Sequence, residues 1–273
     1  MVTKYFRFFG RIYRPVIYGA VFSILFFSSI YPAFSKGPID FTLSEAIRFD
    51  CGFKLDDMKP RMTVHGDTIC YYGEMNYVSF SLFKKNLSPR IKFVVIRSSG
   101  GEAYYSVEIG KLFDRFQPTI IVDRICASGC AYFLFLAADK KVIKKNSFVG
   151  FHGGVPETRA EAFAEGERRK FNKLPPDRQA KFWQEFDNIL SFQKYLLSRT
   201  GVNKDLIYWD PNKRIRKDIL AGCRPPNNTI WAPSPKTLKS FGVKGLIYAW
   251  YPASYKDMFK FGKRHSSTSC LVP

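Results

Sequence analysis

Residues 125–134, with the sequence ICASGCAYFL, constrain the fold of this chain more than any other stretch. The β-branched run that leads into them, residues 119–122, predicts a short buried strand. The apolar segment that leads out, residues 131–138, predicts a buried helix. Ser128, flanked by small residues, therefore stands where a strand turns into a helix. Free N–H groups and the helix dipole favour developing negative charge at such a turn, although serine is also an ordinary helix N-cap.

Two neighbouring motifs favour the functional interpretation of Ser128. Residues 93–96 predict a buried strand that ends in RSSGG, and a helical pattern follows over residues 102–116. A Gly pair lets the backbone approach a ligand closely, and its N–H groups can line an anion pocket. Further on, the apolar sequence SFVGFHGG places His152, one of three histidines, at the end of another predicted strand, 24 residues after Ser128.

This order of motifs resembles the proteolytic subunit of Clp protease and the wider Clp/crotonase superfamily. The resemblance covers roughly residues 91–154, and the CASGCA and GFH sequences also look like a group of secreted bacterial Clp-like proteins. It implies an α/β fold: a Clp/crotonase-like spiral of β-β-α units with a helical appendage. It also implies that Ser128 is the nucleophile, that His152 is the general base, and that the N–H groups of Gly101 and Gly129 form the oxyanion hole.

The third catalytic residue of the family is not evident in this sequence. In Clp peptidases an acid orients the histidine, and it precedes a segment similar to residues 231–243 here, where this chain has Asn228. Loss of that acid can lower the rate by ~10⁴. Asn228 can orient the ring by hydrogen bonding, and Asp205 and Asp210 are the other candidates, with surface or capping roles as their alternative. The orienting residue is therefore left unassigned.

The N-terminal residues 1–35 predict export. Four cations and no acid occur there, and residues 16–34 are apolar, a pattern typical of a signal peptide or of an N-terminal membrane anchor. The cations favour a cytoplasmic N-terminus, and a buried helix is the alternative. We expect localisation in the periplasm or cell envelope, with cleavage and anchoring both left open.

Cysteine usage agrees with an oxidising compartment, where disulfides persist. Cys126 and Cys130 flank Ser128, and we expect them to be small buried apolar groups, with a bridge across the turn as the alternative. The sequence contains no C-x-x-C pair, and His65 and His265 stand alone, so no metal site is expected. No cofactor is expected either. The remaining cysteines can pair with a connectivity that the sequence does not fix: Cys51, Cys70, Cys223 and Cys270.

The charge of the chain indicates which partners to expect. The formal net charge of +20 favours anionic surfaces such as a membrane, and no nucleic-acid-binding motif occurs.

The periodicity of the chain indicates its domain organisation. An apolar helical face over residues 177–197 predicts packing against the chain's own core, with an oligomer contact as the alternative. The chain is expected to consist of five parts. They are the signal or anchor (residues 1–35), a core with the nucleophile and base (36–157), the helical appendage (158–200), the C-terminal part of the core (201–254) and a basic tail (255–273).

From these observations we expect an exported or membrane-anchored serine hydrolase, most naturally a peptidase. Its partners would be a peptide or protein substrate and, as the family resemblance implies, further copies of the same chain. One alternative is an inactive Clp-like scaffold or binding module of the bacterial envelope, which the missing acid favours. Another is an acyl-CoA enzyme of crotonase type, which export disfavours.

Overall fold

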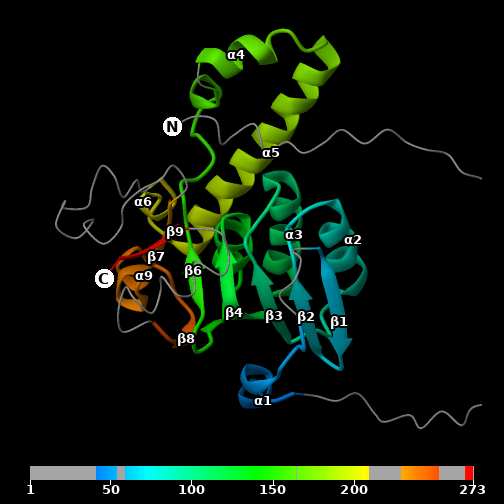
Figure 1. Ribbon diagram of the computed structural model, residues 1–273, viewed down its shortest axis with the longest axis vertical. Coiled ribbons are helices and arrows are strands. Elements are labelled where there is room, and N and C mark those ends of the chain that lie inside the picture. Colours follow the sequence, from blue (N-terminus) through cyan, green and yellow to red (C-terminus); the bar gives the residue numbers. More distant parts are fainter. Residues whose placement is uncertain (1–40, 54–58, 164, 209–228, 252–267, 273) are drawn as a thin grey trace, which may run out of the picture.

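The computed structural model describes residues 41–53, 59–163, 165–208, 229–251 and 268–272 (Figure 1). The expected signal or anchor segment, Asp210, Cys223, Asn228 and most of the predicted basic tail lie outside these ranges. Within them, no helix combines the length and the apolar character that crossing a bilayer requires.

A seven-stranded sheet forms the centre of the described structure. Only its first pair, β1 with β2, is antiparallel, and the other pairs are parallel. Its strands, in spatial order, are β1 (Arg61–His65), β2 (Thr68–Tyr72), β3 (Phe93–Ser98), β4 (Thr119–Ala127), β5 (Lys141–Ile143) and β8 (Leu246–Ala249), with β6 (Phe148–Gly150) paired to the end of β4. The α/β class expected from the sequence is confirmed.

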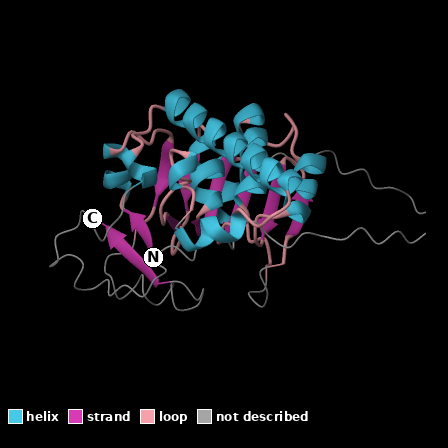
Figure 2. Cartoon of the chain, turned by 90° about the horizontal axis from the view of Figure 1, so that it is seen from above, coloured by secondary structure: helices cyan, strands magenta, loops and turns pink. Residues whose placement is uncertain are grey.

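Most of the helices lie on one face of this sheet (Figure 2). A second, two-stranded parallel sheet joins β7 (Thr229–Pro233) to β9 (Thr268–Val272). The helices, in chain order, are α1 (Leu43–Arg48), α2 (Tyr77–Asn86), α3 (Ala103–Phe116), the π-helix η2 (Cys130–Phe135), the 3₁₀ turn η3 (Arg159–Glu161), α4 (Glu165–Phe171), α5 (Pro176–Thr200), α6 (Asp205–Tyr208) and α9 (Pro235–Ser240).

The central strands are buried on both faces, as their continuous apolar runs predict. Because side chains alternate along a strand, Val94 and Ile96 enter the main core beneath the helices. Val95 and Ile121 enter a smaller cluster on the other face, which Ala46 of α1 covers. The strand ends that carry the motifs described above therefore emerge from a buried, packed layer.

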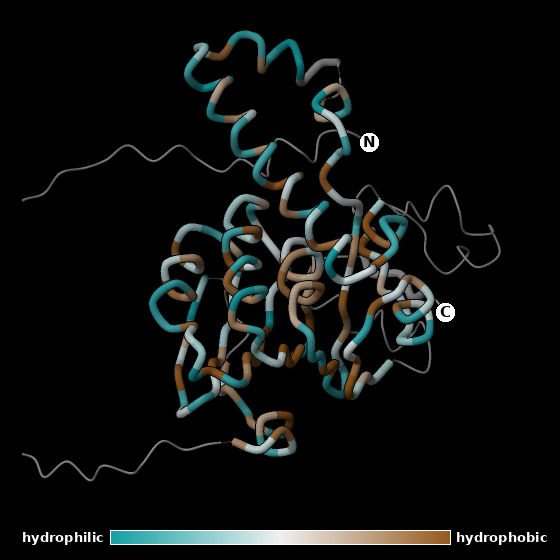
Figure 3. Tube along the Cα trace, turned by 180° about the vertical axis from the view of Figure 1, so that it is seen from behind, coloured by the Kyte–Doolittle hydropathy of each residue, from teal (hydrophilic) through white to brown (hydrophobic). Residues whose placement is uncertain are grey.

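The segment α4–α5 projects beyond the sheet and is the helical appendage of the fold (Figure 1). Figure 3 shows its projecting part coloured mostly as hydrophilic, unlike the strands. The apolar side chains near its outer end pack on one another, with Phe163 and Phe171 against Phe182 and Trp183. Own-chain packing thus accounts for much of the apolar face that the sequence predicts.

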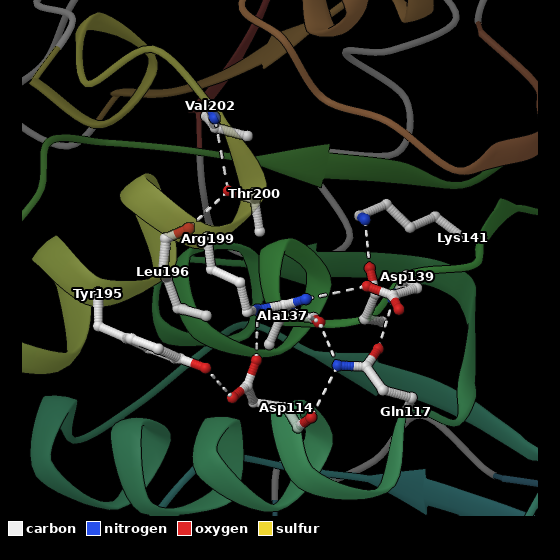
Figure 4. Close-up of polar contacts among 11 residues, drawn as sticks. Asp114, Gln117, Ala137, Asp139, Lys141, Tyr195, Leu196, Arg199, Thr200 and Val202 are labelled. Atoms are coloured by element: carbon white, nitrogen blue, oxygen red, sulfur yellow. Dashed lines mark hydrogen bonds and ion pairs between the residues drawn. The ribbon is translucent and has the colours of Figure 1, made fainter.

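The inner end of α5 is held to the body by Arg199 (Figure 4). Its guanidinium contacts Asp114 of α3 at 2.6 Å and Asp139 at 3.1 Å, and it donates to the carbonyl of Ala137. Tyr195 adds a hydrogen bond from its hydroxyl to Asp114 at 2.9 Å. Because Arg199 is about a quarter exposed, this network fixes the direction of the helix more than it adds stability.

A buried lysine beside this network predicts a pH-dependent stability. Burial lowers the pKa of Lys141 to about 8; its ammonium donates to the Ala138 carbonyl. Between pH 8 and the unfolded value of 10.5, the unfolded chain binds more protons at this site, so its contribution to stability rises with pH. We expect Lys141→Met to raise the free energy of unfolding at pH 7 by about 1–3 kcal/mol.

The measurement is urea unfolding of both proteins from pH 7 to pH 10. The difference between Lys141→Met and the wild type should shrink as the pH rises through 8, because the wild-type lysine loses its charge. A difference that does not change with pH would show that the ammonium carries no burial penalty.

Candidate active site

The edge of the sheet that carries the site is formed where β4 changes its neighbour. β4 pairs with β5 as far as Val122 and then with β6 from Ile125 to Ala127. Because β4 and β6 are parallel, their carboxyl ends meet at the same edge. Ser128 follows β4 directly, and its N–H donates to the carbonyl of Gly150, the last residue of β6, at 2.9 Å.

Ser128 has a backbone conformation that serine rarely adopts. Its φ is 54°, in the left-handed region, where residues other than glycine are strained. The strain is held by hydrogen bonds on both sides, because the Ser128 carbonyl also accepts from the N–H of Tyr132 at 2.9 Å. Only 6% of the residue is exposed. The strand therefore turns sharply into η2 and presents the serine hydroxyl at the start of a helix.

Cys126 and Cys130 form a disulfide that spans Ser128, which corrects our expectation that they are separate apolar groups. The sharp turn at Ser128 brings their Cα atoms to 5.2 Å, within the range that a disulfide requires. Both residues are fully buried. A second disulfide joins Cys51 to Cys70, two of the four cysteines whose pairing the sequence left open.

The disulfide across the turn predicts a combined loss of stability and rate. In Cys126→Ala/Cys130→Ala the five-residue loop is no longer closed, which costs about 2 kcal/mol of unfolding free energy. For the hydrolase expected from the sequence, turnover should fall as well, because Ser128 is freer to leave its strained conformation. The measurements are urea unfolding and the rate of peptide hydrolysis.

The Cys51–Cys70 bridge provides the matched control. It closes a longer loop, with a sequence separation of 19, so its removal should cost about 3 kcal/mol. It should leave the turnover number unchanged, since neither cysteine is part of the turn at Ser128. Equal turnover in both double variants would contradict a positioning role for the Cys126–Cys130 bridge.

His152 lies where the chain leaves β6. Phe151, the residue before it, forms an antiparallel bridge with Trp231, with reciprocal backbone hydrogen bonds of 2.8 and 2.7 Å. The N–H of His152 donates to the hydroxyl of Tyr132 at 2.7 Å. Its Nε2 lies 2.6 Å from Oγ of Ser128. The two side chains that the sequence marks out as nucleophile and base are therefore in direct hydrogen-bond contact.

The Gly100–Gly101 turn lies against the serine. Met75 holds it from one side, accepting from the N–H of Glu102 at 2.7 Å and donating to the carbonyl of Gly100 at 2.8 Å. Because alternate groups of an extended chain point to opposite sides, the N–H of Gly101 faces away from Met75. A Cβ on Gly100 would lie 2.5 Å from that of Ser128, so only glycine allows this close approach.

Gly129, the residue after Ser128, lies close to the Gly100–Gly101 turn. A Cβ on this residue would lie 2.1 Å from Oγ of Ser106 in α3 and 4.0 Å from the nitrogen of Gly101. The backbone N–H groups of Gly101 and Gly129, expected to form an oxyanion hole, thus belong to two chain segments in close contact beside Ser128. An arrangement of this kind can stabilise negative charge on a carbonyl oxygen held there.

The candidates for the orienting residue are only partly described. Asp205 is the first residue of α6, and its N–H donates to Oδ1 of Asn203 at 2.9 Å. Asp210 and Asn228 lie outside the described residues. The assignment of the group that orients His152 stays as open as the sequence left it.

Carboxylates gather next to the Gly100–Gly101 turn. Burial raises the pKa of Glu102 above its ordinary value, and the negative charges of Glu185 and Glu74 raise it further. Burial likewise raises the pKa of Glu185, on α5. A positively charged group is favoured over a negative one beside these three side chains. In the described parts of the chain, no group of three or more His, Cys, Asp or Glu is placed to hold a metal.

The sequence motifs missed one residue that touches this site. Tyr132 lies in the apolar run after Ser128, where the pattern predicts only a buried helix. The one feature of the sequence that could have indicated this contact is the tyrosine hydroxyl within an apolar run, because a buried tyrosine usually finds a hydrogen-bond partner.

Comparison with known proteins gives distant structural similarities only. No protein-family model matches the chain, and no curated protein matches it. Among solved structures it is similar to a ClpP1 variant from Listeria monocytogenes, at 16% identity and a TM-score of 0.41, covering 69% of this chain and 94% of that one. It is also similar to the 1510-N membrane-bound stomatin-specific protease, at 11% identity and a TM-score of 0.37, with 76% and 95% covered.

An enoyl-CoA hydratase from Mycobacterium avium subsp. paratuberculosis is similar at 12% identity and a TM-score of 0.30, covering 54% of this chain and 82% of that one. TM-scores this low do not support an inference about activity. What the site does must therefore be argued from its own residues.

Proposed function

We propose that this chain is a serine hydrolase, and specifically a peptidase of Clp type, with Ser128 as nucleophile and His152 as general base. The observation that carries the proposal is the 2.6 Å separation of the Ser128 Oγ and His152 Nε2 atoms. Nucleophile and base must be within hydrogen-bond reach for the base to accept the proton as the oxygen attacks.

The reaction follows from the positions of these groups. Oγ of Ser128 attacks the carbonyl carbon while its proton passes to Nε2 of His152. The N–H groups of Gly101 and Gly129 hold the resulting oxyanion. The imidazolium then protonates the leaving amine, and the acyl-serine remains. Water, deprotonated by His152, attacks this ester and releases the acid, which restores the free serine.

The conformation of Ser128 favours this proposal over an inactive scaffold. A residue other than glycine at φ 54° costs energy, and such strain persists where the surroundings enforce it, often at active sites. Here a disulfide and two backbone hydrogen bonds enforce it. A binding module would need neither this strained serine nor a histidine against its hydroxyl.

Location and partners belong to the same proposal. The disulfides Cys51–Cys70 and Cys126–Cys130 favour an oxidising compartment, because cytosolic thiols are kept reduced. Together with the basic and apolar N-terminal residues, they support a periplasmic or envelope protein, cleaved or anchored. The net charge of +20 supports contact with an anionic membrane surface. Family resemblance supports a peptide or protein substrate and a homo-oligomer.

Digestion of a mixed-sequence peptide library tests the reaction class. The oxidised full chain and its Ser128→Ala variant are incubated with the library, and the new termini are identified by mass spectrometry. We expect cleavage by the wild type alone. Cleavage by both proteins, or hydrolysis only of simple esters by the wild type, would contradict a peptidase.

A further inference from the structure

We propose that Tyr132 is a positioning residue that holds the base against the nucleophile. Its side-chain hydroxyl accepts a hydrogen bond from the backbone N–H of His152 at 2.7 Å. Its own backbone N–H donates to the carbonyl of Ser128 at 2.9 Å. One residue thus binds the backbone of both proposed catalytic residues. The inference rests on the proposed function and adds to it the group that sets the distance between Ser128 and His152.

The contact matters because of where His152 lies. The chain before it is fixed, since Phe151 is paired with Trp231 through two backbone hydrogen bonds. The chain after it turns away through Gly153, whose φ of 102° only glycine adopts readily. His152 is therefore at the end of the regular pairing. Its hydrogen bond to the hydroxyl of Tyr132 also holds the backbone of His152 in place. The imidazole side chain is therefore attached to a fixed Cα position.

Packing fixes Tyr132 itself. Only 4% of the residue is exposed, and its ring meets the rings of Phe151 and His152 edge to face, at centroid distances of 5.4 and 5.8 Å. Because this burial holds the ring in place, its hydroxyl offers the N–H of His152 a fixed acceptor. Because η2 begins at Cys130, two residues after Ser128, and Tyr132 lies in its first turn, the base is positioned by the same turn that presents the nucleophile.

The alternative is that Tyr132 only fills space in the core. Tyr132→Phe separates the two roles, because phenylalanine keeps the ring contacts and removes the hydroxyl alone. If the role is positioning, the turnover number should fall ~10- to 100-fold, since small misplacements of reacting groups cost rates of this order. KM should stay close to the wild-type value, because the hydroxyl is not proposed to touch substrate.

Tyr195→Phe is the matched control. Tyr195 lies in α5, and its hydroxyl donates to Asp114 of α3. The variant therefore loses a tyrosine hydrogen bond of similar length without touching the turn at Ser128 or the chain at His152. Its turnover should equal that of the wild type. Equal turnover in Tyr132→Phe and the wild type, with folding intact in both, would overturn the positioning role.

A second readout does not depend on activity. The readout is the NMR chemical shift of Nε2 of His152, measured in the full chain with isotope-labelled histidine, which reports the hydrogen bond to Ser128. The His152→Gln variant, which lacks this signal, assigns it. We expect Tyr132→Phe to move this shift toward that of a free imidazole, and Tyr195→Phe to leave it unchanged. An unchanged shift in Tyr132→Phe contradicts the inference. Absence of hydrolysis by the wild type contradicts only the proposed function, because the shift still decides whether Tyr132 positions the base.

Discussion

Replacing Ser128 by alanine is expected to lower the turnover number for a peptide substrate by ~10⁶, to the level left by binding and the oxyanion groups alone. The variant loses only the hydroxyl oxygen, which in the wild type lies 2.6 Å from His152 Nε2. Alanine occupies φ 54° about as poorly as serine does, so the fold should be retained. The measurement is the steady-state rate, with near-ultraviolet circular dichroism to check tertiary structure.

Ser128→Gly is the matched control for this substitution. It should be equally inactive, yet its unfolding free energy should exceed that of Ser128→Ala by about 1 kcal/mol, because glycine adopts a positive φ without strain. Turnover well above background in either variant would show that another group attacks the substrate.

Replacing His152 by alanine is expected to lower turnover by ~10⁴ to 10⁶, because the serine then has no base to take its proton. Catalytic groups that act as a unit are strongly non-additive. Ser128→Ala/His152→Ala should therefore be no slower than Ser128→Ala alone. Rates of the two single variants and the double variant, measured at one pH, give this comparison.

His65→Ala controls for the loss of an imidazole elsewhere. His65 is exposed on the edge strand β1, where Nε2 lies 3.0 Å from Oγ1 of Thr63, and its removal should leave turnover unchanged. Two results would count against a common mechanism: normal turnover in His152→Ala, or a double variant much slower than Ser128→Ala.

The buried parallel strands were the part of the fold that the sequence predicts well. Continuous apolar runs lead into the Gly pair and into Ser128, and the structure places strands β3 and β4 there. Such runs are informative because a parallel strand is covered on both faces. By contrast, β1 was not predicted, because its sequence RMTVH alternates polar and apolar residues over only five positions and the strand is mostly exposed.

Other features depend on contacts between distant residues. β8 joins the sheet through β5, about a hundred residues earlier, and no local pattern encodes that pairing. The Cys126–Cys130 disulfide depends on the left-handed φ of Ser128, which is unusual for serine and invisible to periodicity. The proposed role of Tyr132 depends on a hydrogen bond from a backbone N–H twenty residues away.

At the site, the motifs marked Ser128, His152 and the two glycines, and the structure brings these four residues together. Spacing along the chain cannot give that result alone. It follows from the change of partner along β4, which aligns the end of β6 with the serine. The orienting group for His152 stays a prediction shared among Asn228, Asp205 and Asp210.

Labelling with a fluorophosphonate probe tests most directly whether Ser128 is an activated nucleophile. The oxidised full chain is treated with the probe, and the adduct is located by mass mapping, alongside Ser128→Ala and His152→Ala. We predict an adduct on Ser128 in the wild type, none in Ser128→Ala, and a greatly slowed reaction in His152→Ala. No adduct on the folded wild type, or an adduct on Ser128 that forms equally fast without His152, would contradict the proposed Ser128–His152 pair.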